Sequence, residues 1–170
     1  HDVFLDRLAS AASSLKQGLP IDLSTQTGSM VNKAQFDKVL HYVGLGREEG
    51  ARLVTGGEHL TGGDLANGFF ISPAVFADVD HDSRLAREEI FGPVMAVMPF
   101  DDYDDGLRYA NDTQFGLTAS VYTSDVSKAM KFANDVEAGY VWVNDSSRHF
   151  LGVPFGGYKD SGLGREEDIE

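Results

Sequence analysis

Residues 118–144 read TASVYTSDVSKAMKFANDVEAGYVWVN, and this stretch indicates the fold class. In its middle, apolar residues recur at the spacing of an amphipathic helix, at Val126, Ala129, Met130, Ala133 and Val136. Apolar runs at 118–123 and 139–144 flank the helix and are typical of buried strands. Helices that alternate with buried strands indicate an α/β protein. We therefore expect an α/β fold with a largely parallel sheet flanked by helices.

The rest of the chain extends this alternation. Helical spacing predicts helices at 3–15, at 36–43 and near 102–111. Short apolar runs predict strands at 51–54, 69–71, 74–79 and 93–100. Gly44 and Gly46 are interpreted as the end of the second helix. The Gly-rich segment 145–164 has little periodicity, which is typical of a functional loop.

Composition limits the classes of function. The chain has 170 residues with 42% hydrophobic content, enough for one substantial core, so one domain is the default expectation. Its 27 acidic and 14 basic residues give a formal charge of −13, which opposes binding to nucleic acid or to an anionic membrane. The five histidines lack i,i+4 pairing and cysteine partners, so no metal site is predicted.

Segment 88–94, EEIFGPV, contains the clearest candidate binding residues. Glu89 places a carboxylate two residues before the ring of Phe91, beside a rigid Gly-Pro step. An ionised carboxylate only accepts hydrogen bonds, so it suits a pair of sugar hydroxyls, and a flat apolar ring can position an adjacent heterocycle. Taken alone, two acids before an apolar run are also typical of a solvated helix end.

Further segments of this kind follow one another along the chain. They are QFDK at 35–38, GFFISP at 68–73, EEIFGPV at 88–94, NDTQFGLTA at 111–119, GYVWVN at 139–144 and PFGGYKDSGLGRE at 154–166. In this order they resemble the aldehyde dehydrogenase superfamily. The resemblance covers essentially the whole chain, and the order makes it specific although each motif alone is weak.

This resemblance implies an enzyme that oxidises an aldehyde to a carboxylate with NAD or NADP. In the family a cysteine thiolate adds to the carbonyl, hydride passes to nicotinamide, and water cleaves the thioester. This chain contains no cysteine. We therefore expect residues 1–170 to be the C-terminal portion of a catalytic domain, inactive alone, with the nucleophile and the cofactor-binding half before His1 and an oligomerisation strand after Glu170. The parent would be a cytoplasmic homo-dimer or homo-tetramer.

The family motifs assign roles on the cofactor side. Glu89 would accept hydrogen bonds from the nicotinamide ribose hydroxyls, and Phe91 would help to place the nicotinamide ring. Gln35 and Lys38 lie three apart, so one helix face can direct both toward a ligand. The family places such a pair near the cofactor's ribose and phosphates, although Lys38 could equally be a solvated helix charge. Glu88 should point elsewhere, as a surface carboxylate.

On the substrate side, Phe155 matches an aromatic residue of the substrate tunnel, with simple core packing as the alternative. His149 stands where many relatives carry an apolar residue, so it could contact substrate or cap the loop. Together with Arg148 it could favour aldehydes that carry an anionic or polar group. Asn144 ends an apolar strand, where its amide can satisfy the backbone of the irregular loop that follows. The resemblance adds a supporting role in shaping the catalytic pocket. Ser161 is interpreted as a turn residue, because no glycine precedes it by two positions.

Two other readings remain open. A CoA-acylating or glutamyl-phosphate-reducing relative would share the fold and would also carry its nucleophile outside this chain. A non-catalytic truncated module would be expected to lose the cofactor motif. Glu89 and Phe91 are intact, which favours the enzyme.

Overall fold

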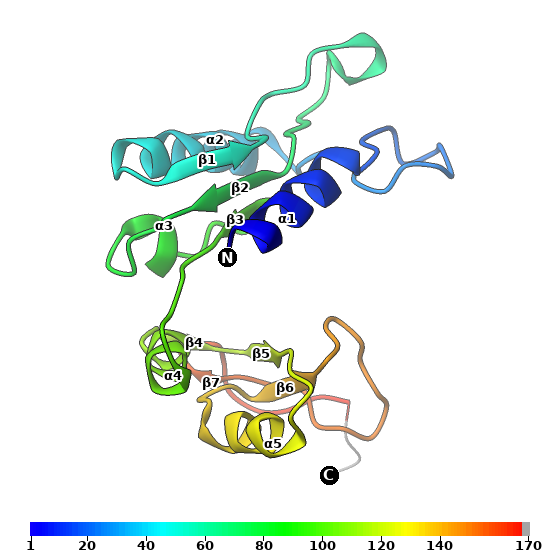
Figure 1. Ribbon diagram of the computed structural model, residues 1–170. Coiled ribbons are helices and arrows are strands. Elements are labelled where there is room, and N and C mark those ends of the chain that lie inside the picture. The colour runs from blue at the N-terminus through cyan, green and yellow to red at the C-terminus, as the bar shows by residue number, and fades with distance from the viewer. Residues whose placement is uncertain (168–170) are drawn as a thin grey trace. The chain divides into compact units, whose positions relative to one another are not determined.

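The computed structural model describes residues 1–167, and the chain divides into two compact units, 1–99 and 100–170 (Figure 1). Composition gives one domain as the default expectation, and the structure shows two compact units within the chain. The physical reason is that each unit buries apolar residues of its own. Val39 and Phe76 are completely buried in the first unit, while Ala129 and Trp142 are buried in the second.

The first unit is built on a three-stranded sheet of order β1-β2-β3. β2 (Ala74–Ala77) lies in the middle, pairing antiparallel with β1 (Arg52–Thr55) and parallel with β3 (Val94–Ala96). All four β2 residues are buried. Helix α1 (Asp2–Ser14) contacts β1 and β2, and α2 (Lys33–Glu48) contacts β1 and the short α3 (Arg84–Arg87) (Figure 1). Between β1 and β2 the chain forms the 3-10 turn η1 (Gly63–Leu65).

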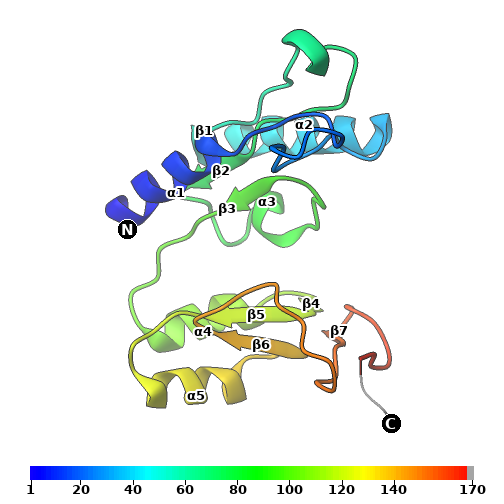
Figure 2. The same cartoon turned by 90° about the vertical axis from the view of Figure 1, so that its right-hand side faces the viewer.

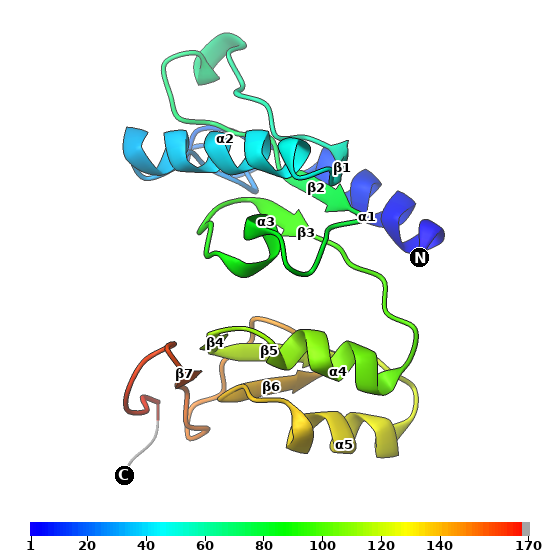
Figure 3. The ribbon, with the colours of Figure 1, turned by 90° about the vertical axis from the view of Figure 1, so that its left-hand side faces the viewer.

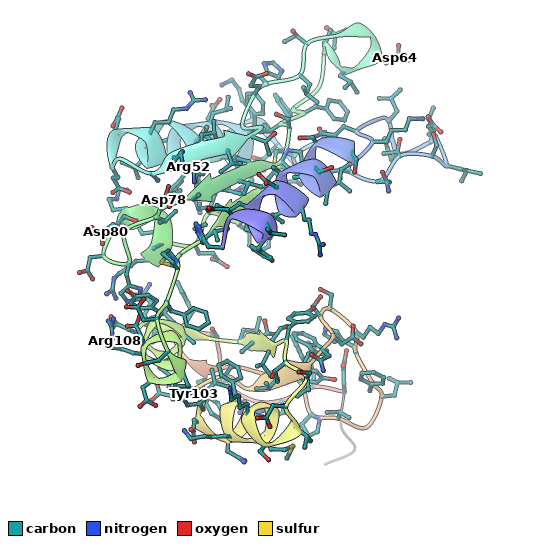
Figure 4. The ribbon with its side chains drawn as sticks, viewed as in Figure 1. Arg52, Asp64, Asp78, Asp80, Tyr103 and Arg108 are labelled. Atoms are coloured by element: carbon teal, nitrogen blue, oxygen red, sulfur yellow. The ribbon has the colours of Figure 1, made fainter. Side chains whose placement is uncertain are left out.

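An ion pair joins two neighbouring strands at the edge of this sheet. Arg52 begins β1 and Asp78 follows β2, and the structure places their side chains together (Figure 4). The Nε of Arg52 lies 2.8 Å from a carboxylate oxygen of Asp78. Both side chains are about half exposed, so this pair contributes little, roughly 0–1 kcal/mol, to stability.

The predicted end of α2 is wrong. The helix begins after Asn32, whose side chain accepts a hydrogen bond from the backbone N–H of Gln35 at 2.9 Å, and it continues through Gly44 and Gly46 to Glu48. A Cβ added at Gly46 would lie 2.9 Å from Leu85 Cδ2 and equally close to the Phe76 ring. Gly46 is therefore required for close packing rather than for ending the helix.

The strand predictions in this unit are partly confirmed. The runs at 51–54 and 74–79 form β1 and β2. The run at 93–100 forms a strand only over Val94–Ala96, and the run at 69–71 forms an isolated bridge between Ile71 and His59. These two runs extend beyond the residues that find a hydrogen-bonding strand partner.

The second unit contains a βαβ crossover. Strand β5 (Thr118–Val121) leads through α5 (Val126–Asp135) to β6 (Tyr140–Val143), and β5 and β6 pair in parallel. Helix α5 packs against both strands (Figure 3). It begins at Asp125, whose carboxylate accepts from the backbone N–H groups of Ser127 and Lys128. The sequence-predicted elements of this stretch are confirmed.

Two short strands complete the second unit with α4 (Tyr103–Asn111). β4 (Phe115–Gly116) pairs antiparallel with β7 (Tyr158–Lys159), which lies inside the predicted functional loop (Figure 2). The Oγ of Ser161 accepts a hydrogen bond from Gly116 N–H at 2.9 Å, and Ser161 lies in a turn as predicted. The α/β class is thus confirmed, with partial sheets in which parallel and antiparallel pairs are mixed. Among residues 1–167, no helix combines the length and apolar character needed to cross a bilayer.

Candidate functional site

Residues 88–92 connect α3 to β3 and present two side chains outward. Glu89 is exposed, and the Phe91 ring is 77% exposed. Among the described residues 1–167, the Glu89 carboxylate has no hydrogen-bond or ion-pair partner. Phe91 has a φ of +55°, in the left-handed region that bulky residues rarely adopt. An exposed, unpartnered carboxylate and ring on an unusual backbone are typical of a binding segment.

Gln35 and Lys38 both contact the backbone of this segment. The Gln35 side-chain amide donates to the carbonyls of Ile90 and Phe91, each at 2.8 Å. The Lys38 ammonium donates to the Glu89 carbonyl at 2.6 Å. The structure therefore brings together all four residues that the sequence assigns to the cofactor. Gln35 and Lys38 reach the segment through three consecutive carbonyls.

Glu88 is held by a different set of groups. Arg84 donates to its two carboxylate oxygens at 2.9 and 3.0 Å, and the Tyr42 hydroxyl donates to the second of these oxygens. The hydrogen bonds from Arg84 and then Tyr42 lower the pKa of Glu88 from its ordinary 4.5 to about 2. The hydrogen bond between Tyr42 and Glu88 also raises the pKa of Tyr42. The sequence predicts that the Glu88 side chain points elsewhere than that of Glu89. These contacts agree, because the Glu88 carboxylate is bound by Arg84 and Tyr42.

Sequence reasoning missed Arg84 and Tyr42. Two signals could have found them. Arg84 precedes Glu88 by four residues, the spacing of a helical ion pair. Tyr42 follows Gln35 by seven residues, so it lies on the same face of α2.

Gly92 allows the segment to lie close against α2. A Cβ added at Gly92 would lie 2.3 Å from Cγ2 of Val39, a residue with no exposed surface. Any other residue would push the segment away from the helix. The Gly-Pro step noted in the sequence is therefore a packing requirement as well as a turn.

Asn144 closes the end of the β5–β6 pair. Its side-chain oxygen accepts from the backbone N–H of Thr123 at 2.9 Å, and its side-chain nitrogen donates to the Thr123 carbonyl at 3.0 Å. The residue itself has a φ of +55°. These contacts give Asn144 a structural role at the strand end, while its support of a catalytic pocket stays a prediction.

Phe155 and His149 belong to an aromatic cluster formed with Tyr140 and Trp142. The His149 ring centroid lies 4.4 Å from that of Phe155, and it stacks on Tyr140 at 5.9 Å with an interplanar angle of 17°. His149 Nδ1 also lies 3.0 Å from a carboxylate oxygen of Glu167. These contacts hold the His149 ring against its neighbours, and its contact with a substrate stays a prediction. Phe155 also borders a hollow of about 320 Å³ lined mainly by residues 156–166.

Arg148 contributes to this loop through its backbone. Its carbonyl accepts a hydrogen bond from the Trp142 indole at 2.7 Å. Its side chain is 75% exposed and lies 3.7 Å from the Asp145 carboxylate. The guanidinium is therefore close to one acid and open to solvent.

The chain is similar to known proteins over its whole length. The sequence model of the aldehyde dehydrogenase family matches residues 1–170. An aldehyde dehydrogenase of Talaromyces stipitatus is 48% identical over 174 residues, covering 100% of this chain and 34% of that protein. A betaine aldehyde dehydrogenase of Mesorhizobium japonicum is 43% identical, covering 99% of this chain and 35% of that protein. The chain thus spans about a third of the length of the curated relatives it matches.

Solved structures show the same similarity. The crystal structure of betaine aldehyde dehydrogenase from Staphylococcus aureus in complex with NAD+ superimposes with a TM-score of 0.96 at 35% identity, covering 99% of this chain and 34% of that one. An aldehyde dehydrogenase from Bacillus cereus gives a TM-score of 0.93 at 39% identity, with 99% and 33% covered. A family match over the whole chain, joined to this agreement in fold, shows that the chain belongs to the aldehyde dehydrogenase family.

Proposed function

We propose that this chain is part of a longer NAD(P)-dependent aldehyde dehydrogenase, in which Glu89 and Phe91 hold the nicotinamide ribose and ring. The observation that carries the proposal is the Glu89 carboxylate, which is exposed and has no partner among residues 1–167. Its backbone carbonyl, by contrast, is held by Lys38. The segment is thus anchored through its main chain while its ligand-binding side chains are left available.

The chemistry of these groups fits the nicotinamide half of the cofactor. A carboxylate with two oxygens can accept hydrogen bonds from both hydroxyls of a ribose. The exposed Phe91 ring offers a flat apolar surface for a heterocycle. When bound, NAD(P)+ supplies a hydride acceptor. The task of Glu89 and Phe91 is then to orient that acceptor toward the reacting carbon.

Gln35 and Lys38 keep some capacity for direct contact with a cofactor. The two N–H groups of the Gln35 amide go to backbone carbonyls, which leaves its side-chain oxygen as an acceptor. Lys38 uses one of three N–H donors on the Glu89 carbonyl. Direct binding of ribose or phosphate by these residues stays a prediction.

The substrate is proposed to be an aldehyde. Phe155 would supply an apolar wall and His149 a polar group beside it. Arg148, the residue before His149, would add a cation from the same loop, and Asn144 would support the end of its strand. NAD versus NADP, the particular aldehyde, the cytoplasmic location and assembly as a homo-dimer or homo-tetramer stay predictions. The relatives reported above are named as aldehyde dehydrogenases, which favours this reading over CoA-acylating, glutamyl-phosphate-reducing and non-catalytic alternatives.

Replacement of Glu89 by Gln in the full-length enzyme tests the proposal. A hydrogen bond to a charged group contributes about 1.5–3 kcal/mol, so loss of this contact should slow hydride transfer roughly 10- to 100-fold. Single-turnover formation of NAD(P)H measures this step. Glu48→Gln is the matched control, since Glu48 is an exposed carboxylate at the end of α2. Equal single-turnover rates for Glu89→Gln and wild type would refute the assigned role.

A further inference from the structure

We propose that Gln35 and Lys38 are positioning residues, which fix the main chain of Glu89–Phe91 so that the two cofactor-binding side chains are oriented before the cofactor arrives. This inference rests on the proposed function and deepens it. The observation behind it is that side chains on one face of α2 bind the carbonyls of consecutive residues of the segment. Lys38 binds the carbonyl of residue 89, and Gln35 binds those of 90 and 91.

Contacts with α2 also reach residues 88 and 92, at the two ends of the segment. Positions 35, 38 and 42 follow the i, i+3, i+7 spacing of one helix face. Tyr42 at the far end of this face binds the Glu88 side chain, and Arg84 holds the same carboxylate from α3. Val39, on the same side of α2, lies against Gly92. Every residue from 88 to 92 therefore has a contact with α2 through a side chain or its main chain.

The backbone of Phe91 explains why such anchoring is needed. A phenylalanine at a φ of +55° is in an unfavourable conformation, which persists only when surrounding contacts hold it. The ring itself is 77% exposed and so provides little packing of its own. The amide of Gln35 binds the carbonyls immediately before and at this residue. Without these donors the peptide can relax toward negative φ, which would redirect the ring.

Misorientation has a large effect on a transfer reaction. A displacement of about 1 Å at a reacting centre can reduce a rate about 100-fold. Cofactor affinity depends on many contacts and should change less than the hydride step. A positioning role therefore predicts a split, in which kcat falls more than the cofactor KM rises.

Three methionine substitutions in the full-length enzyme test the inference. Gln35→Met and Lys38→Met keep side-chain length and remove the donors. Lys33→Met is the matched control, because Lys33 is on the same helix and its one ion pair among residues 1–167 is an exposed one with Asp37. Lys38→Arg restores a cationic donor and is the rescue variant.

Two measurements are made on each variant. Amide hydrogen exchange of the peptide covering 85–95 reports the anchoring of the segment without any need for activity. Single-turnover hydride transfer and the cofactor Kd report its consequence. We expect faster exchange in that peptide and roughly 10-fold slower hydride transfer for Gln35→Met and Lys38→Met. Lys33→Met should match wild type. Lys38→Arg should recover most of the exchange protection of the peptide and most of the rate of hydride transfer.

Unchanged exchange in both donor variants would overturn the inference, even if the cofactor Kd rises, because direct contact would then be the role of these residues. It would also be overturned if exchange rises while hydride transfer slows only in Glu89→Gln. Faster exchange with no slowing in any variant, Glu89→Gln included, would support the anchoring and refute the cofactor role of Glu89. The two proposals can thus fail separately.

Discussion

Glu88 and Glu89 are adjacent and chemically identical, yet the structure gives them different tasks. Glu88 is bound by Arg84 and Tyr42, so its carboxylate is committed within the protein. Glu89 has no such partner among residues 1–167 and is available to a ligand. The difference arises because successive side chains in an extended segment point in opposite directions.

The binding of Glu88 predicts a pH dependence of stability. Its pKa falls from 4.5 in its ordinary state to about 2 in the folded protein. A depressed folded pKa contributes stability that is present above about pH 4.5 and is lost as the pH falls through about 2. Glu88→Gln should therefore lower the urea midpoint at pH 7, and the difference from wild type should narrow as the pH approaches 2.

Urea unfolding of both proteins at a series of pH values from 7 to 2 measures this effect. Glu48→Gln is the control, because Glu48 is exposed and has no partner among residues 1–167. A difference between wild type and Glu88→Gln that stays constant over the whole pH series would contradict the prediction.

At the scale of elements, α2 supports both the core and the candidate site. One side of the helix buries Val39 and Val43, while Gln35, Lys38 and Tyr42 contact the 88–92 segment. The helix must also approach Phe76 and Leu85 closely at Gly46. A shift of α2 would therefore affect the sheet and the 88–92 segment together.

The two glycines inside α2 predict opposite effects of the same substitution. Gly46→Ala places a Cβ 2.9 Å from Leu85 Cδ2 and the buried Phe76 ring, and such overpacking costs about 1–3 kcal/mol. Gly44→Ala meets no atom within 4 Å, so it should only gain helix propensity, about 0.5–1 kcal/mol. Denaturant unfolding at neutral pH measures both free energies. A stabilised Gly46→Ala protein would show that the core relaxes around the added methyl.

At the scale of the whole molecule, the chain corresponds to part of the proteins that it matches. It spans about a third of their length and contains no cysteine. The 88–92 segment, proposed to hold the cofactor, lies in the first unit, and the proposed substrate-side residues lie in the second. The thiolate expected for the covalent step is not supplied by any of the 170 residues.

We therefore expect the isolated 170-residue chain to lack aldehyde dehydrogenase activity. Without a cysteine it cannot form the thioester through which the family oxidises aldehydes. NAD(P)H formation with a panel of aliphatic, aromatic and charged aldehydes measures this, with a mock preparation as the control. Turnover by the purified chain above the mock level would contradict the expectation.

Local pattern was sufficient for much of the architecture. The helices at 2–14 and 126–135 and the strands at 118–121 and 140–143 agree with their apolar spacing, because that spacing depends on neighbouring residues alone. Motif order was likewise sufficient for the family. The two-residue strands β4 and β7 were missed, since so short a pairing leaves no periodic signal.

The sequence by itself determined the α/β class, the family and the candidate residues of the 88–94 segment. Only the tertiary structure decided that α2 passes through Gly46, because that depends on Phe76 and Leu85 packing against it. It also decided which groups Gln35 and Lys38 bind, namely main-chain carbonyls 51 to 56 positions away. Such contacts join a side chain to a distant main chain. No spacing rule contains them, because they arise when packing brings separate elements together.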